Sequence, residues 1–384
     1  MNSTGTKTAL FTTALCCAAA AEACTSWMIH PSCTKDGRMI VQKCRDSRPS
    51  PLTADIRTAP DGRRWMRIGT GDHYATFAMN DKGIVAIMND GDDLTVKHRG
   101  GEYLGIGTGN MLHMIMCDAD NACAGALMVR DYGRNGRRNG RGGTLFVADA
   151  KRAFLIDVGP GYGEMKELTG GMVVISNCLH LPGVEEISCQ KVGSLRGDRS
   201  REANVRAALK AARVDGKYTP RGTIKVSRMR CGKAMKDKYP FRKNSLGGVC
   251  FEIDGEFPAH LSTAYIALGP QQHTLYLPCP MALRQFPESI RGGQWADIAY
   301  KFREKAGDDH KLVGELFKFE DKIIPEYETV REKARGLLRA GKTAEAEKLL
   351  NDTFSSQFEA AETLLKGLYE KSEVNPDSFR NSCF

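Results

Sequence analysis

The chain has 384 residues, of which 41% are hydrophobic and 26% charged, as in an average globular protein. This composition excludes a disordered chain, a collagen-like protein and a multi-span membrane protein, and the length allows one large domain or two ordinary ones. The 55 Lys and Arg residues against 46 Asp and Glu give a net charge of +9, which bears on solubility and on encounters with anions.

The N-terminus has the features of a secretory signal peptide. An apolar run of 13 residues, ALFTTALCCAAAA at 9–21, follows Lys7, whereas a transmembrane helix needs about 20. Ala21-Glu22-Ala23 then forms the small-x-small pattern of a signal-peptidase site. We predict that signal peptidase removes residues 1–23, that Cys24 becomes the first residue, and that the protein is secreted or periplasmic.

Two alternatives to this interpretation stay open. The segment could be an N-terminal helix retained in a cytosolic protein, or a lipoprotein signal, which also ends immediately before a Cys. A lipoprotein signal normally has a small uncharged residue where this chain has Glu22, so we do not expect a lipid anchor or stable membrane insertion. Export also permits disulfides among the 11 cysteines from Cys24 onward, whose pairing the sequence does not fix.

Strands dominate the first two thirds of the mature chain. Turn residues between short apolar runs predict three hairpins, at 27–41, 74–88 and 144–158. A helix is expected at 111–129, and further strands at 172–176, 249–253, 263–268 and 274–277. The tract RNGRRNGRGG at 134–143 is interpreted as a loop, because an exported protein is not expected to bind nucleic acid.

Two helices are predicted near the C-terminus. Apolar residues recur at a 4-3-4-3 spacing over 320–340, Gly341 ends this helix, and Thr343 is expected to cap a second one. We expect this helical hairpin to pack on the main domain, although an arm that binds a partner by coiled-coil packing is an alternative. The predicted organisation is a signal peptide (1–23), a main domain (24–295) and a helical extension (296–384).

Removal of the signal peptide would give Cys24 an unusual chemistry. Its thiol and a new α-amino group would belong to one residue, and an α-amine has a pKa near 8, well below that of a lysine side chain. The amine could therefore take the thiol proton, so that nucleophile and base are placed together without a histidine. The alternative is that Cys24 is an ordinary buried or disulfide-bonded cysteine.

The residues after Cys24 resemble the start of N-terminal-nucleophile cysteine amide hydrolases. Cys24-Thr25-Ser26-Trp27, the Asp36-Gly37 turn and Lys43-Cys44-Arg45-Asp46 are similar to bile salt hydrolase and penicillin V acylase, to acyl-coenzyme A:6-aminopenicillanic acid acyltransferases, and to cysteine dipeptidases. The resemblance covers roughly residues 24–280. It implies an α+β fold, a four-layer αββα sandwich with two antiparallel sheets between helices, here with the C-terminal helical hairpin added.

The same resemblance implies the catalytic set Cys24, Lys43, Asp46, Asn89 and Asn177. Cys24 is the nucleophile and Asp46 orients its amine; Asn89 by its backbone and Asn177 by its side chain hold the oxyanion. Lys43 stands where bile salt hydrolases have an arginine, a role that the neighbouring Arg45 could take instead. These families also place an arginine on a later strand, for which we leave Arg201, Arg206 and Arg228 outside the catalytic set, since Arg201 and Arg206 fit the solvated face of a helix.

The sequence thus predicts a secreted amidohydrolase that cleaves a small peptide or N-acyl amide through a cysteine thioester. No cofactor is expected, and no metal, because the His and Cys spacing is not typical of zinc. The expected partners are a small-molecule amide or dipeptide substrate and signal peptidase, and the oligomeric state is not predicted. The alternatives are an acyltransferase that uses the same site, and a secreted or lipid-anchored binding protein without enzymatic activity.

Overall fold

The structure is a computed structural model of the chain. It describes residues 24–47, 50–71, 75–91, 108–135, 142–183, 188, 192–230, 239–242, 244–307 and 309–372. The predicted signal peptide, 1–23, and most of the Arg-Gly tract, 136–141, lie outside the described residues. Within the described part, no helix combines the length and the apolar character needed to cross a membrane.

One antiparallel sheet has six strands in the order β10-β1-β2-β11-β12-β13. Its members are β1 (Thr25–Ile29), β2 (Met39–Asp46), β10 (Met172–Ile175), β11 (Ser245–Ile253), β12 (Thr263–Leu268) and β13 (Leu277–Pro280). The first hairpin, β1–β2, is confirmed; its connection contains the short 3-10 helix η1 (Pro31–Cys33) and Gly37, whose φ of 65° favours glycine.

The second antiparallel sheet has seven strands in simple chain order. They are β3 (Leu52–Thr58), β4 (Arg64–Thr70), β5 (Phe77–Asn80), β6 (Val85–Gly91), β7 (Gly142–Ala148), β8 (Ala153–Gly159) and β9 (Tyr162–Glu167). The β5–β6 and β7–β8 hairpins are confirmed. The β3–β4 pair was not predicted, because the buried Arg67 interrupts the apolar pattern of β4. In the structure Arg67 Nε donates a hydrogen bond to Asp55 Oδ2 at 2.9 Å.

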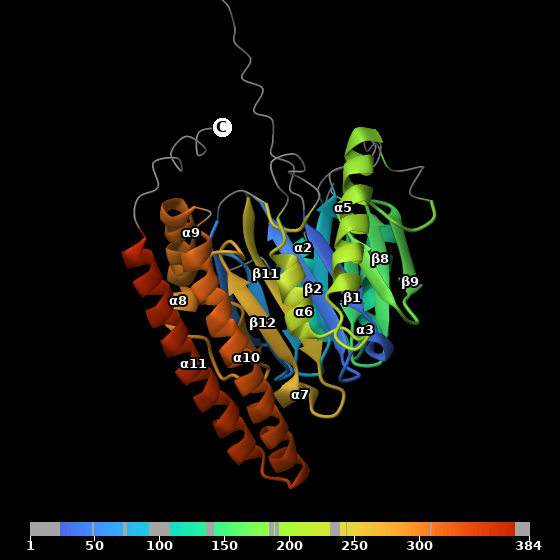
Figure 1. Cartoon of the computed structure of the whole chain (residues 1–384). Helices are drawn as coiled ribbons and strands as arrows, with labels where there is room; N and C mark the ends of the chain where they lie inside the picture. Colours follow the sequence, from blue (N-terminus) through green and yellow to red (C-terminus); the bar gives the residue numbers. More distant parts are fainter. Residues whose placement is uncertain are drawn as a thin grey trace, which may run out of the picture.

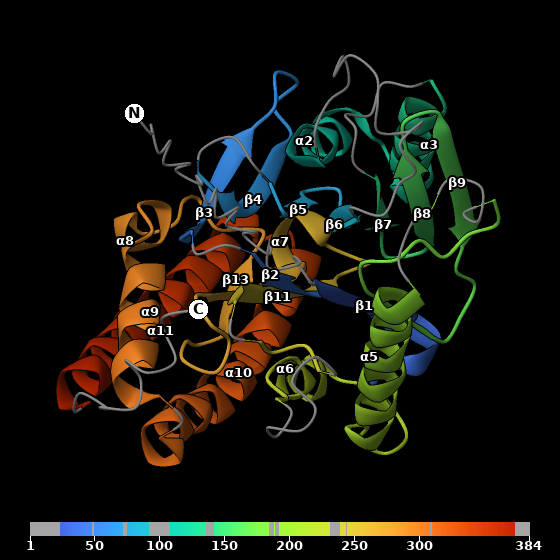
Figure 2. The ribbon, with the colours of Figure 1, turned by 90° about the horizontal axis from the view of Figure 1, so that it is seen from above.

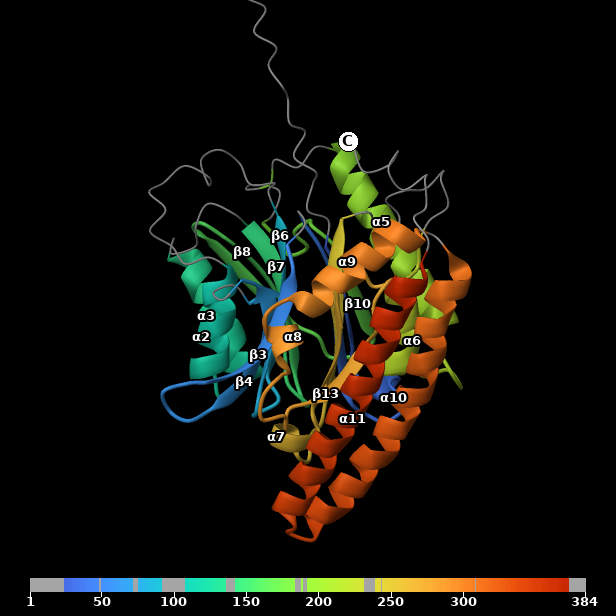
Figure 3. The same ribbon diagram turned by 90° about the vertical axis from the view of Figure 1, so that its left-hand side faces the viewer.

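The two sheets stack face to face between layers of helices (Figures 2 and 3). The helices are α2 (Thr108–Asp118), α3 (Ala122–Arg134), α5 (Val192–Ala211), α6 (Pro220–Ser227), α7 (Pro258–Leu261), α8 (Glu288–Arg291), α9 (Gln294–Ala306), α10 (His310–Arg339) and α11 (Thr343–Lys371). Helices α2 and α3 cover the seven-stranded sheet, and α5, α6 and the long C-terminal helices cover the six-stranded one. The predicted four-layer αββα architecture with a C-terminal helical hairpin is confirmed.

The helical hairpin, α10 and α11, shares the main hydrophobic core with the sheets (Figure 1). Ile323, Phe354 and Leu365 join the cluster that also contains Trp27 and Val249. The predicted boundary between main domain and extension, at 295/296, falls inside α9. Lys342, rather than the expected Thr343, occupies the position before the first turn of α11, and it makes no side-chain cap.

Two other local predictions differ from the structure. The helix expected at 111–129 is two helices: α2 ends at Asp118, and Asn121 caps α3 by accepting a hydrogen bond from Ala124 N at 3.0 Å. The last strand begins at Leu277 rather than at 274, since the Thr274 carbonyl accepts from Arg228 Nη2 at 3.1 Å and bonds a side chain instead of a strand. The eight cysteines of the described part are all free thiols.

Candidate active site

Four of the five predicted site residues lie where strand ends of the two sheets meet. Cys24 immediately precedes β1, Asp46 is the last residue of β2, and Asn177 follows β10 by two residues. Asn89 lies in β6 of the facing sheet, and its side chain reaches β1 and the end of β10. Residues separated by up to 153 positions therefore meet in one place.

Strand pairing explains why these residues meet. β1 pairs with β2 so that Ser26 lies opposite Lys43, and with β10 so that Ser26 lies opposite Ile175. Continued by two residues, the same antiparallel register would set Cys24 opposite Arg45 on one side and Asn177 on the other. Alternation along a strand then puts the side chains of Cys24 and Ser26 on the same face of the sheet.

The Cys24 thiol is fully buried and has two polar neighbours. Arg45 Nη1 lies 3.5 Å from the sulfur, and the thiol donates to the Asp46 carbonyl oxygen at 3.8 Å. A guanidinium beside a sulfur stabilises the negative charge that forms when the thiol loses its proton. Arg45, the alternative to Lys43 in the sequence analysis, is thus the residue of the pair that touches the nucleophile.

Lys43 lies further into the interface between the sheets. It is fully buried, its ammonium donates to the Met88 carbonyl oxygen, and its nitrogen sits 5.5 Å from the centre of the Phe77 ring. These contacts join the two sheets next to Asn89. The structure therefore brings Lys43 to the wall of the site and Arg45 to its sulfur.

Asp46 is a fully buried site residue whose pKa is shifted by burial. Its Oδ1 accepts from Ser245 Oγ at 2.6 Å, whereas its buried Oδ2 has no hydrogen-bond partner among the described residues and lies 3.8 Å from Arg242 Nε. Burial raises the pKa of this carboxyl to about 6, against the opposing influence of Arg242, Ser245, Arg201 and Arg45. One carboxylate oxygen thus remains available to a donor.

The Asn89 side chain is occupied by structural hydrogen bonds. Its Oδ1 accepts from Ser26 Oγ at 2.7 Å, and its Nδ2 donates to the Ser176 carbonyl at 3.1 Å and to the Ile175 carbonyl at 3.4 Å. Any contribution of Asn89 to an oxyanion hole would therefore have to come from its backbone, as the sequence analysis expected. The side chain itself ties the end of β10 to β1 and β6.

Asn177 is oriented from α5. Arg201 Nη2 lies 3.4 Å from Asn177 Oδ1, which turns the oxygen of the amide toward the helix. Arg201 also pairs with Asp198 and is only 1% exposed. The expectation that it lies on a solvated helix face is wrong. Its guanidinium is buried beside Asn177 and is close enough to Asp46 to lower the pKa of that carboxyl.

Glu202, the neighbour of Arg201 on α5, was missed entirely by the sequence analysis. Its Oε1 accepts from Ser176 N at 3.0 Å, Ser176 Oγ at 2.7 Å, Cys178 Sγ at 3.5 Å and His180 Nε2 at 2.9 Å. Burial raises its pKa, but bonds from His180 and Ser176 and the charge of Arg199 lower it to about 2. A single carboxylate thus holds both flanks of Asn177.

Cys178, His180 and Glu202 also form the group of side chains in the described residues that could hold a metal, with ligand atoms within 4.8 Å of one another. The carboxylate oxygen is already saturated with donors, and the buried His180 Nδ1 has no partner there to orient it as a metal ligand. Burial and the charge of Glu202 raise the pKa of Cys178 far above its ordinary value, which keeps the thiol protonated. The cluster is thus better described as a hydrogen-bond network centred on the Glu202 carboxylate than as a metal site.

The other arginines considered from the sequence lie elsewhere. Arg228 pairs with Glu320 of α10, and Arg206 lines a cavity at the C-terminal half of α5. Arg242, which nothing in the sequence singled out, lies at Asp46 instead. Its position just before β11 is the only local signal that could have suggested it.

Comparison with known proteins yields structural neighbours only. No protein-family model matches the chain, and no curated protein matches it in sequence. Among solved structures, it resembles a Caenorhabditis elegans ortholog of N-acylethanolamine-hydrolyzing acid amidase, with 9% identity and a TM-score of 0.41 over 59% of this chain and 91% of that one. It also resembles a variant of the conjugated bile acid hydrolase of Clostridium perfringens, with 11% identity and a TM-score of 0.42 over 63% and 89% of the two chains. The values for the penicillin V acylase of Agrobacterium tumefaciens are 8%, 0.35, 64% and 84%.

By their names the three neighbours are an acid amidase, a bile acid hydrolase and an acylase, and the last two are among the families that the motifs around Cys24 resemble. At these identities and TM-scores the likeness says nothing about activity. What the site of this chain can do therefore has to follow from its own geometry.

Proposed function

We propose that the mature protein is an amide hydrolase whose nucleophile is the thiol of an N-terminal Cys24. Two features found together carry this proposal. The buried Cys24 thiol lies beside the Arg45 guanidinium, and nearby a buried Asp46 oxygen has no hydrogen-bond partner in the described structure. A buried carboxylate oxygen without a donor is costly in a folded protein. An α-ammonium group created at Cys24 by processing would supply that donor.

The proposed reaction has two halves. The neutral α-amine of Cys24 takes the thiol proton, and the sulfur attacks the carbonyl carbon of the amide, forming an S–C bond and a tetrahedral oxyanion. Collapse breaks the C–N bond, and the ammonium group returns the proton to the leaving amine. Water, deprotonated by the same amine, then attacks the thioester, releases the carboxylic acid and restores the thiol.

The surrounding residues have distinct roles in this scheme. Asp46 Oδ2 orients the amine, and Arg45 stabilises the thiolate before attack. The Asn177 side chain and the Asn89 backbone donate to the oxyanion as it forms. Arg201 and Glu202 hold Asn177 from both sides and are positioning residues rather than catalytic ones. Lys43 is a weaker member of the catalytic set, because it contacts the facing sheet and not the sulfur.

The proposed substrate class rests on the expected export and on the charges around Cys24. We propose a small peptide or N-acyl amide as substrate, and water rather than a second amine as the acyl acceptor, since a secreted enzyme meets few activated acyl donors. The positive groups at the site, Arg45, Arg201 and Arg242, would favour a substrate with an anionic group near the scissile bond.

The decisive experiment tests whether the free α-amine of Cys24 is required in addition to its thiol. Mature protein that begins at Cys24 is compared with protein that keeps one Met before Cys24, using a panel of N-acyl amino acids, dipeptides, bile salt conjugates and penicillin V. The extra residue turns the amine into an amide, so hydrolysis should be lost while circular dichroism shows a folded protein, and the melting temperature should be equal or lower, because Asp46 Oδ2 then lacks its proposed donor. Equal rates in the two proteins, with the Met shown by intact mass to be retained, would overturn the proposal.

A further inference from the structure

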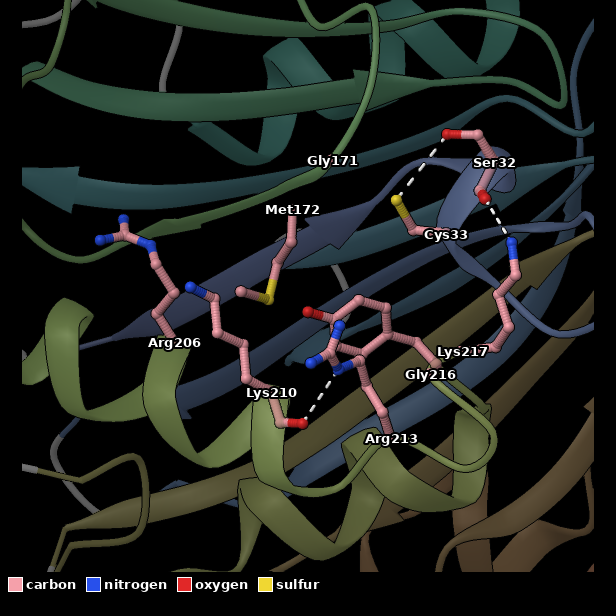
Figure 4. Close-up of a pocket in the computed structure, with 10 residues that line it drawn as sticks. Ser32, Cys33, Gly171, Met172, Arg206, Lys210, Arg213, Gly216 and Lys217 are labelled. Atoms are coloured by element: carbon pink, nitrogen blue, oxygen red, sulfur yellow. Dashed lines mark hydrogen bonds between the residues drawn. The ribbon is translucent and has the colours of Figure 1, made fainter.

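A second concave site lies at the other end of β1 from Cys24. A cavity of about 390 Å³ is formed by the end of η1, the start of β10, the C-terminal half of α5 and the loop before α6 (Figure 4). Because β1 has five residues and a strand rises about 3.3 Å per residue, this cavity is about 17 Å from the thiol. It is separate from the candidate active site.

The lining of this cavity is strongly positive. Arg206, Lys210, Arg213 and Lys217 contribute to it, and none of its lining residues is Asp or Glu. Arg206 and Lys210 come from α5, as Figure 4 shows, and Arg213 and Lys217 from the turn that follows. Four cationic side chains thus line one cavity.

These cations differ from most others in the described structure, which pair with carboxylates. Arg213 Nε donates to the Lys210 carbonyl at 3.0 Å and Lys217 Nζ to the Ser32 carbonyl at 2.8 Å, while no carboxylate in the described residues pairs with any of the four. Like charges at the i, i+4 spacing of Arg206 and Lys210 destabilise a helix. A basic residue in the last helical turn is favourable by itself, which accounts for Lys210 but not for Arg206 or Lys217.

The remaining walls suit the organic part of a ligand. Met172 and the ring of Tyr218 give the cavity an apolar side, and the Arg213 guanidinium lies 5.9 Å from the centre of that ring. Burial raises the pKa of Tyr218, so its phenol remains protonated and can donate a hydrogen bond. The volume exceeds that of a single inorganic ion.

We propose that this cavity binds a small phosphorylated organic molecule that carries at least two negative charges. Guanidinium groups bind phosphate oxygens in a bidentate manner, and lysines add compensating charge. Occupancy would relieve the repulsion among Arg206, Lys210 and Arg213. The proposal is independent of the reaction at Cys24.

Calorimetric titration of mature protein with inorganic pyrophosphate, at low ionic strength, tests this site. We expect saturable binding at one site per chain, weakened by salt, and tighter than the binding of citrate. The double variant Arg206→Gln/Lys210→Gln should bind at least about tenfold more weakly. The matched control Lys318→Gln/Lys322→Gln removes the same charge, at the same spacing, from α10, and should change affinity by less than about twofold.

Three results would overturn the proposal. They are the absence of saturable pyrophosphate binding, an equal loss of affinity in the control variant, and citrate binding as tight as that of pyrophosphate. Cosedimentation with vesicles of anionic phospholipid distinguishes the source of the phosphate: vesicle binding without pyrophosphate binding would also overturn the proposal of a soluble ligand. If the pocket double variant fails to fold, the exposed Lys210→Gln alone, with Lys322→Gln as its control, serves the same comparison.

Discussion

The strand β11 carries buried polar groups at both of its ends, and the two ends are built differently. Near its start, Ser245 binds Asp46, whose second oxygen has no hydrogen-bond partner among the described residues. Near its far end, Glu252 binds Arg331 of α10 and Arg38, and the next residue but one, Asp254, binds Arg335. Both ends bury carboxylates in the same sheet.

The pKa values of these carboxyls move in opposite directions. Burial raises the pKa of Asp46 to about 6, because the cations near it do not compensate for lost solvent. Burial also acts on Glu252 and Asp254, but hydrogen-bonded arginines outweigh it and lower both pKa values. The comparison teaches that desolvation alone does not decide the charge of a buried acid; the geometry of its partners does.

The difference suggests a division of labour. At the far end, paired charges fix the helical hairpin to the sheet. At the end with Cys24, a buried carboxylate has one oxygen without a partner among the described residues, the oxygen to which we assign the proposed α-ammonium group, and perturbed carboxyls of this kind are a feature of functional sites. The predictions that follow test whether the two ends contribute to catalysis and to stability separately.

The largest effect is expected for the nucleophile. Cys24→Ala should lower kcat by about 10⁶, because no other group in the scheme can form the acyl intermediate. Cys24→Ser should retain only a trace, since a hydroxyl is far less ionised near neutral pH. Rates are measured with the best substrate of the panel, and circular dichroism confirms the fold; undiminished hydrolysis by the Ala variant would remove Cys24 from the mechanism.

Next comes the orienting carboxylate. Asp46→Asn should lower kcat by about 10³–10⁴, and in the wild type kcat/KM should fall at acid pH, where Asp46 takes up a proton. Pairing with the proposed α-ammonium group would move this fall below pH 6. Without that partner, burial raises the pKa of Asp46 to about 6. The folded-state pKa is raised, so the stability that this group contributes is present at low pH and lost as pH rises from about 4 to about 6.

In protein that keeps one residue before Cys24, and so lacks the proposed α-ammonium partner, Asp46→Asn should accordingly not destabilise the fold at pH 7 relative to the same form of the wild type. Chemical denaturation should show an unfolding free energy equal to that of the wild type or higher by up to about 3 kcal/mol, the equivalent of a two-unit pKa shift. The same carboxylate would thus cost stability and supply activity. A variant that is strongly destabilised yet fully active would reverse this assignment.

At the other end of β11, Arg331→Met should act on stability alone. Removing the guanidinium leaves Glu252 buried with weaker pairing, and should lower the unfolding free energy by about 3–5 kcal/mol. The double variant Arg331→Met/Glu252→Gln should recover much of this loss, because no unpaired charge remains. Both should keep wild-type kcat at a temperature where they are folded, and a selective loss of kcat would show that the two ends are coupled.

The smallest of these effects is expected for the oxyanion donor. Asn177→Ala should lower kcat by about 10²–10³ with little change in KM, since the amide binds the oxygen only as it gains charge. Glu202→Gln serves as the comparison, because it disturbs the flanks of Asn177 and leaves its amide in place, and should cost less. Wild-type kcat in a folded Asn177→Ala variant would make Asn177 a simple strand-end residue.

Much of this architecture could be predicted from short stretches of sequence. The hairpins around Gly37 and Gly83 follow from turn residues between apolar runs, and the long C-terminal helices follow from apolar spacing and from Gly341, whose φ is 72°. The small-x-small pattern before Cys24 predicts the mature N-terminus, which stays a prediction. Signals of this kind lie within about ten residues of one another, so no knowledge of the fold is required.

The buried polar groups could not be predicted in the same way. Arg201 and Glu202 are adjacent charged residues in a helix, a pattern that normally indicates a solvated surface, yet both are buried against the end of β10. The buried Arg67 likewise interrupts an apolar strand pattern, so that the β3–β4 hairpin was not predicted. In each case at least one polar partner of the buried group lies on another element, although Arg201 also pairs with Asp198 of its own helix.

The sequence by itself determined which residues we predict to react: a cysteine after a predicted signal peptide, an aspartate on the next strand and two asparagines on or near later strands. Only the tertiary structure decided that Arg45 and not Lys43 touches the thiol, that Arg242 and Ser245 surround Asp46, and that Asp46 keeps one oxygen without a partner among the described residues. The physical reason is that the first fact depends on the register of the β1–β2 hairpin, the others on the pairing of β2 with the distant β11, and all of them on the solvent that packing excludes. Neither quantity is encoded in any local pattern of side chains.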